Sequence, residues 1–335
     1  MRQSTIIQSR LSYPDFNEYT SQDTKKMAPV YKFALIQLQP KPNDPAANFA
    51  KAESEIRKAA ANGCHVAILP EFHLTGWDPE HPDFITASTD SQAYLPRYQS
   101  LARELDISIV PGTICESHPA TEHAPPRAQA HETLEGKELR NMAHFISAGT
   151  GSIAGSYQKK NLWHPERPHL TPGRHQPHSA FDTPLRNADG SPVRAGLLVC
   201  WDLAFPEAFR ALIADGAQVI FIPSYWTVTD VDEAGLALNP DSERTFLESC
   251  VVSRAFENTA CVVFCNKGGC SQVALPIVGR VKNEGGGEVG LDEEGVIYSE
   301  VDLDVLRVAE ENYKVREDIK GRGWHYGYEI VRDQA

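Results

Sequence analysis

The sequence lacks any long apolar run. No uninterrupted apolar stretch approaches the roughly twenty residues that a membrane-spanning helix requires, and the longest candidates are residues 66–69 and 219–222. Basic residues are also scarce, because 32 Lys and Arg stand against 45 Asp and Glu, for a formal net charge of -13. Such a charge repels phosphate backbones and anionic membrane surfaces. We therefore expect neither nucleic acid nor a membrane as a partner.

The seven cysteines form an odd set. Several lie in apolar runs such as residues 260–265, which indicates buried, reduced thiols rather than a disulfide framework. A reducing compartment, the cytoplasm, is expected. Residues 1–29 lack the apolar centre of a secretory signal and mix basic with acidic residues, so they are predicted to form an irregular N-terminal extension. A mitochondrial address is the alternative, which the acidic residues disfavour.

From residue 31 the pattern becomes regular and predicts an α/β protein. Residues 33–38 and 66–70 read as buried strands on either side of a helix at 48–62 that ends at Gly63. Three further helix-then-strand units are expected, at 92–105 and 107–111, at 207–215 and 219–223, and at 245–257 and 260–266. Residues 141–147 and 155–159 should pair as strands, 116–138 form an exposed insertion, and 279–301 a late hairpin set. The main domain is predicted to span residues 30–315, followed by a polar tail at 316–335.

Glu71 is the first candidate for chemistry, since it directly follows the predicted strand at 66–70. The ends of buried strands are where α/β proteins place active-site groups, and Pro70 helps to end the strand. Taken alone, a glutamate here is equally well explained as a helix cap or a member of a salt bridge.

Cys200 is the second candidate, at the junction between a strand at 196–199 and a helix that begins near Pro206. Backbone N–H groups near a helix start favour a thiolate. A cysteine in apolar surroundings is nevertheless more often structural.

Lys159 is the third candidate, because it closes a strand next to a second lysine, Lys160. Side chains alternate across a strand, so one of the two lysines should face inward. Without other signals, both would be expected in solvent.

Taken together and in this order, Glu71, Lys159 and Cys200 with their flanks resemble the Glu-Lys-Cys set of the nitrilase superfamily of carbon-nitrogen hydrolases. The resemblance covers residues 31–313. The family pattern around the lysine is Tyr-Arg-Lys-x-His-Leu, so Lys159 takes the catalytic position, while Gln158 replaces the arginine and Asn161 the histidine. A second family glutamate is similar in register to Glu166.

The resemblance implies a four-layer α-β-β-α sandwich that forms homodimers or larger homo-oligomers. It implies that Cys200 attacks a carbonyl carbon to form a thioester, that Glu71 shuttles protons, and that Lys159 and the backbone N–H of Trp201 stabilise the oxyanion. Glu166 would hold Lys159 or orient the substrate nitrogen. No metal and no other cofactor is implied.

The segment from Cys200 to Glu207 resembles the amidase and carbamoylase members more than true nitrilases. The expected substrate is therefore a small linear amide or N-carbamoyl compound, with a nitrile, or a catalytically silent binding role, as the alternatives. Aromatic and polar residues near strand ends are candidates for the pocket walls. These candidates are His73, Trp77, Trp163, Tyr225, Trp226 and the loop to Glu243.

Two groups of residues suggest a metal site instead. The first consists of histidines that lie close together in the sequence, namely His164, His169, His175 and His178. Their spacing matches no standard motif such as H-E-x-x-H. The second, Cys261, Cys265 and Cys270, is better explained by buried packing, since its spacing fits a zinc site poorly.

Overall fold

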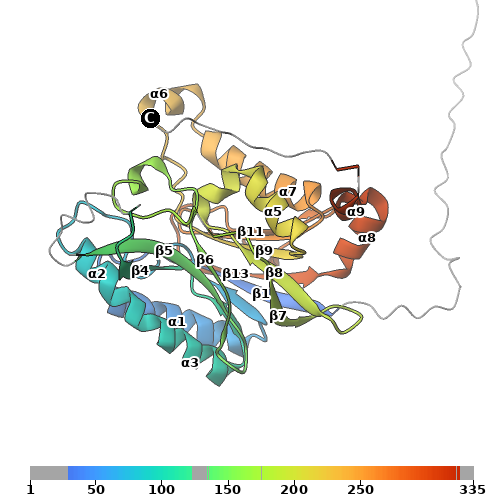
Figure 1. Ribbon diagram of the computed structural model, residues 1–335, viewed down its shortest axis with the longest axis horizontal. Helices are drawn as coiled ribbons and strands as arrows, with labels where there is room; N and C mark the ends of the chain where they lie inside the picture. The colour runs from blue at the N-terminus through green and yellow to red at the C-terminus, as the bar shows by residue number, and fades with distance from the viewer. Residues whose placement is uncertain (1–28, 123–133, 135, 175, 322, 325–335) are drawn as a thin grey trace, which may run out of the picture.

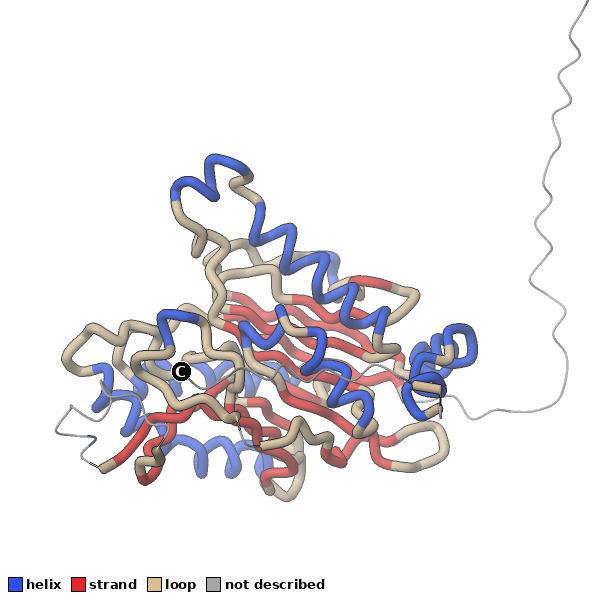
Figure 2. Tube along the Cα trace, turned by 45° about the horizontal axis from the view of Figure 1, so that its top comes forward, coloured by secondary structure: helices blue, strands red, loops and turns tan. Residues whose placement is uncertain are grey.

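Two β-sheets packed face to face form the centre of the protein in a computed structural model (Figure 1). The structure describes residues 29–122, 134, 136–174, 176–321 and 323–324. Helices cover the outer face of each sheet (Figures 1 and 2). The predicted four-layer α-β-β-α arrangement is confirmed.

The first sheet has 7 strands, in the order β13-β1-β2-β3-β5-β4, with β6 paired to β5. Its strands are β1 (Val30–Gln37), β2 (Val66–Ile68), β3 (Ser108–Val110), β4 (Thr113–Pro119), β5 (Lys137–Ile146), β6 (Ile153–Gln158) and β13 (Gly295–Asp302). Strands β1, β2 and β3 run parallel. Their carboxyl ends therefore lie at one edge of the sheet.

The second sheet has 6 strands, in the order β12-β11-β10-β9-β8-β7. Its strands are β7 (Phe181–Arg186), β8 (Pro192–Leu197), β9 (Val219–Ser224), β10 (Cys261–Asn266), β11 (Gln272–Leu275) and β12 (Gly279–Arg280). Here β8, β9 and β10 are the parallel strands. Each sheet thus contributes three parallel strands whose ends can carry functional side chains.

The helices connect these strands and pack on the outer faces. The α-helices are α1 (Pro45–Ala61), α2 (Phe84–Ser91), α3 (Leu95–Leu105), α5 (Pro206–Ala214), α6 (Glu233–Leu238), α7 (Ser242–Glu257), α8 (Asp304–Tyr313) and α9 (Val315–Lys320). The short 3-10 helices are η1 (Gln92–Tyr94), η3 (His164–Glu166), η4 (Cys200–Ala204) and η5 (Glu284–Gly286). Helices α1 and α3 cover the first sheet, while α5 and α7 cover the second (Figure 1).

The largest apolar core fills the space between the two sheets. Phe221 of β9 lies at its middle, with ring centroids 5.8 Å from Phe33 and 5.6 Å from Phe145, which both belong to the first sheet. A second core lies between the first sheet and the helices α1 and α3, where Phe49 packs on Tyr98. Burial of these side chains holds the two sheets in fixed positions.

The helix boundaries follow local sequence signals. In α1 the side chain of Asp44 accepts a hydrogen bond from the backbone of Ala47 at 3.1 Å, and Gly63 beyond the helix has a left-handed φ of 72°. The predicted helix at 92–105 is instead divided into η1 and α3. Pro96 lies in the first turn of α3, where its missing N–H costs least.

The expected late hairpin set was wrong in its pairing, although strands do form at Gly279–Arg280 and Gly295–Asp302. Residues 287–291 form no strand, and β13 pairs antiparallel with β1, far from it in the sequence. Strand β12 pairs with β11. The backbone N–H and C=O groups along a strand at the edge of a sheet need hydrogen-bond partners. Strand β13 supplies these partners to β1.

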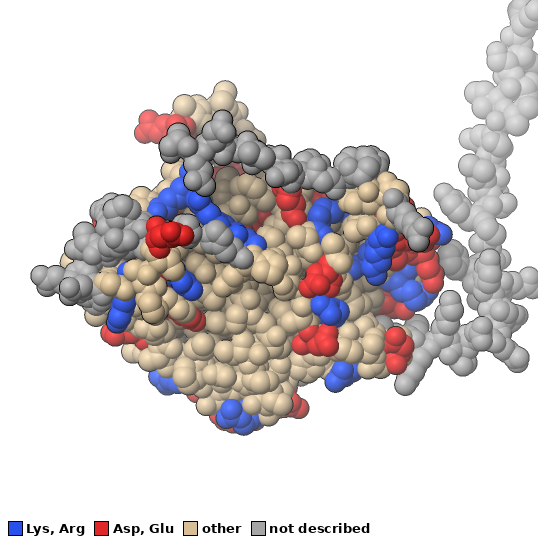
Figure 3. Space-filling view, viewed as in Figure 1, with Lys and Arg blue, Asp and Glu red and all other residues tan. Residues whose placement is uncertain are grey.

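The predicted extension at 1–29 lies outside the described residues except for its last residue, and most of the predicted insertion at 116–138 does so too. Helix α9 occupies the start of the predicted tail at 316–335. Within the described residues, no helix is both long and apolar enough to cross a bilayer. Acidic and basic side chains are interspersed on the face drawn in Figure 3.

Candidate active site

Glu71 lies just beyond the end of β2, with only 1% of its surface exposed. One carboxylate oxygen, Oε1, accepts hydrogen bonds from Asn141 Nδ2 at 2.8 Å and from Lys159 Nζ at 2.8 Å. The other, Oε2, accepts from the backbone N–H of Tyr225 at 2.9 Å. The donors come from both sheets, so the carboxylate is held in a single orientation where the sheets meet.

Lys159 follows β6 and is also buried, whereas its neighbour Lys160 is partly exposed, as the alternation of side chains predicts. The ammonium nitrogen lies 2.8 Å from Glu71 and 2.8 Å from Glu166. Burial by itself disfavours the charged form, but the two carboxylates outweigh it and hold the pKa of Lys159 well above its ordinary value. The lysine therefore carries a fixed positive charge.

Glu166 lies at the end of η3 and is buried. Its Oε2 accepts a hydrogen bond from the backbone N–H of Trp163 at 2.7 Å. Burial and the nearby charge of Glu71 raise the pKa of Glu166 to about 7, against the opposing effect of Lys159. This carboxyl group is therefore poised to change charge near neutral pH.

Cys200 begins η4, where the chain leaves β8, and adopts a left-handed φ of 46°. This conformation is uncommon for a residue other than glycine and is concentrated at functional sites. The sequence predicts that nearby backbone N–H groups favour a thiolate, whereas burial of the sulfur acts in the opposite direction. Burial and the charge of Glu71 raise the pKa of the Cys200 thiol well above its usual range, although Lys159 and Ser224 oppose this effect. The thiol is thus neutral until it loses its proton to a base.

Asp202 joins the turn of Cys200 to the segment that carries Lys159. Its buried carboxylate accepts hydrogen bonds from the Tyr157 hydroxyl at 2.8 Å, from the Asn161 side chain at 2.8 Å and from the Val199 backbone at 2.9 Å. Sequence reasoning missed this role. The only available signal was a carboxylate two residues beyond the cysteine.

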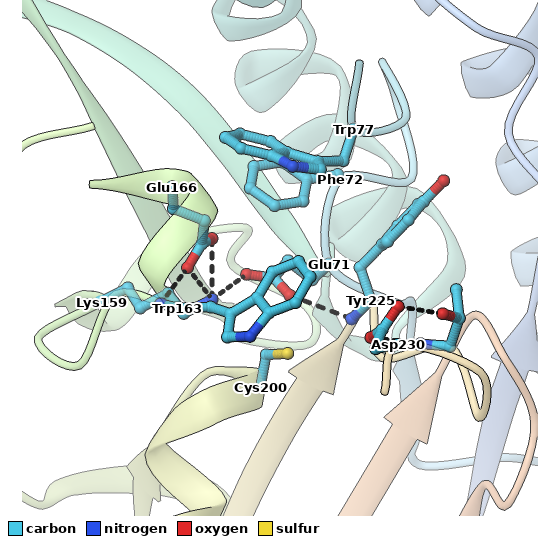
Figure 4. Close-up of a pocket in the computed structure, with 10 residues that line it drawn as sticks. Glu71, Phe72, Trp77, Lys159, Trp163, Glu166, Cys200, Tyr225 and Asp230 are labelled. Atoms are coloured by element: carbon cyan, nitrogen blue, oxygen red, sulfur yellow. Dashed lines mark hydrogen bonds and ion pairs between the residues drawn. The ribbon is translucent and has the colours of Figure 1, made fainter. Parts of the chain in front are cut away.

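A cavity of about 230 Å³ opens onto these groups (Figure 4). Its lining residues lie in the loops and 3-10 helices that follow strands of both sheets, and they are Glu71, Phe72, Trp77, Lys159, Trp163, Glu166, Cys200, Tyr225, Thr227 and Asp230. The predicted wall residues Trp77, Trp163 and Tyr225 are among them. A small, partly enclosed space with aromatic walls and a few charged groups is typical of a small-molecule site.

The structure places two other predicted wall residues, Trp226 and His73, elsewhere. Trp226 is buried behind the cavity, where its ring packs on Trp201 at a centroid distance of 5.1 Å. His73 is buried against Tyr98, with Nε2 2.6 Å from the hydroxyl oxygen, and burial lowers the pKa of His73 to about 3. Of the predicted loop to Glu243, Thr227 and Asp230 line the cavity, whereas Glu243 itself does not and accepts a hydrogen bond from the backbone N–H of Asp230 at 3.0 Å. The rings of Trp226 and His73 are buried in the packed interior and therefore do not line the cavity.

Two residues near the cavity were not identified from the sequence, namely Phe72 and Asn141. Phe72 directly follows Glu71 and stacks on Trp77, with ring centroids 4.9 Å apart. Asn141 lies inside an ordinary strand pattern. Only the pairing of distant segments brings them to the site.

The histidines and cysteines considered as metal ligands are not grouped as a metal site among the residues that the structure describes. Within the described residues, no three His, Cys, Asp or Glu side chains are arranged so that they could hold one ion. Cys261, Cys265 and Cys270 are buried with free thiols, and His175 lies outside the described residues.

A sequence model of the carbon-nitrogen hydrolase family matches residues 32–311. The chain belongs to this family. Family membership, together with the relatives described below, makes the protein a hydrolase of carbon-nitrogen bonds other than peptide bonds.

Several characterised carbon-nitrogen hydrolases are similar over most of the chain. A 2-oxoglutaramate amidase of Bacillus subtilis is 26% identical over 284 residues, which cover 82% of this chain and 92% of the relative. An (R)-stereoselective amidase of a Pseudomonas species is 26% identical, with 86% and 90% of the two chains covered. The crystal structure of an amidase from a Nesterenkonia species has a TM-score of 0.61 at 24% identity, covering 83% of this chain and 92% of the other. This last similarity supports the fold.

Proposed function

We propose that this hydrolase is a cysteine-dependent amidase that cleaves small linear amides or N-carbamoyl compounds through a thioester intermediate. The observation that carries the proposal is the position of Lys159, whose ammonium nitrogen lies 2.8 Å from both Glu71 and Glu166 in the cavity that Cys200 also lines. A neutral thiol, a proton acceptor and a fixed positive charge are the groups that acyl transfer from an amide requires.

Glu71 has the position of a general base in the proposed reaction. As the Cys200 sulfur attacks the carbonyl carbon, the thiol proton moves to the Glu71 carboxylate. The same carboxyl group then donates this proton to the nitrogen as the carbon-nitrogen bond breaks, releasing ammonia or an amine and leaving a thioester. Water attacks the thioester with Glu71 again as base, which releases the acid and restores the thiol.

Lys159 and the turn of Cys200 would stabilise the oxyanion. The Lys159 ammonium group has three N–H donors. One is directed to Glu71 and one is shared by the two oxygens of Glu166. The third is then available for the carbonyl oxygen of the substrate. The backbone N–H of Trp201 lies in the first turn of η4, where N–H groups lack an acceptor within the helix. One such donor is worth roughly 3 kcal/mol of transition-state stabilisation.

Glu166 acts on Lys159 in this proposal. Its carboxylate and the opposing Glu71 hold the ammonium group between them, so the charge is oriented before substrate binds. Preorganised charge avoids the cost of reorientation during the reaction. Glu166 is therefore a positioning residue.

The test is ammonia release from short aliphatic amides, N-carbamoyl amino acids and nitriles by the purified protein and by Cys200→Ala. We expect hydrolysis of amides or carbamoyl compounds, complete loss of activity in the variant, and an acyl mass adduct on Cys200 of the native protein. Full activity of Cys200→Ala, or inactivation by EDTA together with resistance to iodoacetamide, would refute the cysteine mechanism. Turnover of nitriles alone would assign the nitrilase reaction instead.

We also propose a homodimer or larger homo-oligomer. The proposal is supported by α7, which passes close to η4 and bears the exposed aromatic side chains Phe246 and Phe256. Exposed apolar groups on one helix favour association with a second copy. Light scattering after size-exclusion chromatography should give at least twice the chain mass, and Phe256→Glu should lower this mass.

The buried free thiols support a reducing compartment, the cytoplasm.

A further inference from the structure

The cavity has two chemically different ends. Lys159 and Glu166 lie at one end and Asp230 at the other, below the ring of Tyr225, with Glu71 and Cys200 between them (Figure 4). An acyl group attached to the Cys200 sulfur can therefore extend towards Asp230.

The charged lining groups make the cavity acidic. Glu71, Glu166 and Asp230 contribute carboxyl groups, and Lys159 is the cation among the lining residues. That ammonium is already engaged by two carboxylates. An acyl group with its own carboxylate would find no unengaged positive charge among the described lining residues.

A second carboxylate adds to the negative charge at the Asp230 end. The backbone N–H of Asp230 donates to Glu243 Oε2 at 3.0 Å, and the Asp230 side chain accepts hydrogen bonds from Thr227. Within the part of the chain that the structure describes, no lysine or arginine forms an ion pair with either carboxylate. The nearby cation Lys267 is instead paired with Asp292 at 2.7 Å.

The walls between the two ends suit an extended chain that ends in a cation. Trp77, Trp163 and Tyr225 present apolar surface along the cavity, which methylene groups can cover. Aromatic ring faces also attract positive charge. Lys267 already uses one face of Tyr225 in this way, with Nζ 5.6 Å from the ring centroid.

We propose that Asp230 is a specificity-determining residue that selects amides whose acyl chain ends in an ammonium or guanidinium group. This inference rests on the proposed amidase function and names its substrate class. The cation would lie against the Asp230 carboxylate while the carbonyl carbon lies at Cys200. Substrates with a carboxylate at the same distal position are disfavoured by repulsion.

Three amides of matched length test the proposal. δ-Aminovaleramide carries a distal ammonium, hexanamide a methyl group in its place, and glutaramate a carboxylate. Their dissociation constants are measured by calorimetry on Cys200→Ala, which cannot turn them over, and on the same variant with Asp230→Asn. We expect δ-aminovaleramide to bind about fivefold more tightly than hexanamide, as a partly exposed ion pair allows, and glutaramate to bind most weakly. With Asp230→Asn, δ-aminovaleramide and hexanamide should bind with nearly equal dissociation constants.

Measurement of KM and kcat on the protein with Cys200 intact provides an independent test of the role of Asp230. Asp230→Asn should raise KM for δ-aminovaleramide about fivefold with kcat unchanged, because the ion pair is made equally in the ground and transition states. KM for hexanamide should change less than KM for δ-aminovaleramide. Asp232→Asn is the matched control, since it removes a charge from the same loop, lies outside the cavity lining, and still allows the side chain to cap α6.

The outcomes separate this inference from the proposed function. Equal affinities of the three amides, or an unchanged preference after Asp230→Asn, would overturn the role of Asp230 while amide turnover still supports the amidase function. Absence of turnover with every amide would refute the amidase function, and the binding ratios on Cys200→Ala would still decide whether Asp230 selects a cation. A similar loss of affinity in Asp232→Asn would attribute the effect to the loop and overturn the inference.

Discussion

The Asp202 carboxylate and the Asn161 side chain are joined by a hydrogen bond of 2.8 Å. Asn161 stands where the family pattern has a histidine, so this chain keeps a donor at the position while changing the residue. The bond ties the segment after β6 to the turn of Cys200. The segments that carry Lys159 and Cys200, which follow strands of different sheets, thereby share one buried acceptor.

Removing this acceptor should destabilise the protein strongly. Asp202→Ala leaves the Tyr157 hydroxyl and the Val199 N–H without their buried partner, and each unsatisfied group costs about 1–3 kcal/mol. We expect the free energy of unfolding in urea to fall by about 3 kcal/mol or more. Tyr157→Phe removes one donor and should cost only about 1 kcal/mol. Equal losses in the two variants would contradict the role of Asp202 as a shared acceptor.

Lys159→Met should disrupt both stability and turnover. It leaves the buried carboxylates of Glu71 and Glu166 facing each other without a cation, and breaking a buried ion pair from one side typically costs about 3–5 kcal/mol. Activity should fall by at least about 100-fold through loss of oxyanion stabilisation. Lys160→Met is the control, because this neighbour is only partly buried and makes neither contact. Comparable kinetic losses in both variants would refute the assignment of Lys159.

Glu71→Gln should separate thiol reactivity from catalysis. Burial and the Glu71 charge both raise the pKa of Cys200, so removing that charge lowers the pKa and increases the thiolate fraction. Alkylation of Cys200 by iodoacetamide at pH about 8 should therefore become faster, while amide turnover is lost with the base. Mass spectrometry of the alkylated peptides checks the site, with buried Cys261 as the internal control. Slower alkylation in Glu71→Gln would show that the carboxylate activates the resting thiol instead.

Glu166 should make stability depend on pH in a defined direction. Its pKa is raised to about 7 in the folded protein, so the folded state binds more protons than the unfolded state between its ordinary value and about 7. This contribution to stability is present at low pH and is lost as pH rises through that window.

Glu166→Gln should remove this contribution. Melting temperatures measured between pH about 5 and 8 should show the native protein losing stability relative to the variant as pH rises. The exposed residue Glu207 on α5 provides the control substitution, Glu207→Gln. A difference between native protein and Glu166→Gln that grows in the opposite direction would contradict a raised pKa.

Much of this arrangement could be predicted from the sequence because local patterns carry it. Periodicity located the parallel strands, and the order of Glu71, Lys159 and Cys200 identified the family. Long-range contacts could not be predicted in this way. The pairing of β13 with β1 and the approach of Asn141 to Glu71 depend on how distant segments pack.

The aromatic wall residues illustrate the same limit. Tyr225 and Trp226 are adjacent and equally apolar in the sequence, yet one lines the cavity and the other packs on Trp201. Alternation along an extended chain places neighbours on opposite sides. Which side faces the cavity is decided by how the first sheet packs against the second, and the sequence pattern does not show this packing.

Gly112 offers a test of how closely the backbone controls Glu71. The residue has a φ of 56°, and a Cβ added there would lie 1.9 Å from the carbonyl oxygen of Pro70, which precedes the catalytic candidate. Gly112→Ala must therefore displace the turn that holds the Glu71 carboxylate. We expect turnover to fall at least about 100-fold, since misplacement of a catalytic group by about 1 Å is this costly.

Gly63→Ala is the matched control for that substitution. Gly63 also has a left-handed φ, 72°, but nothing lies within 4 Å of the added Cβ. It should incur only the conformational cost of about 1 kcal/mol in unfolding free energy, with kcat unchanged. If Gly112→Ala kept its kcat while losing stability like Gly63→Ala, the position of Glu71 would be independent of this turn. Loss of kcat confined to Gly112→Ala would instead establish that the close packing against Pro70 sets the geometry of the proton shuttle.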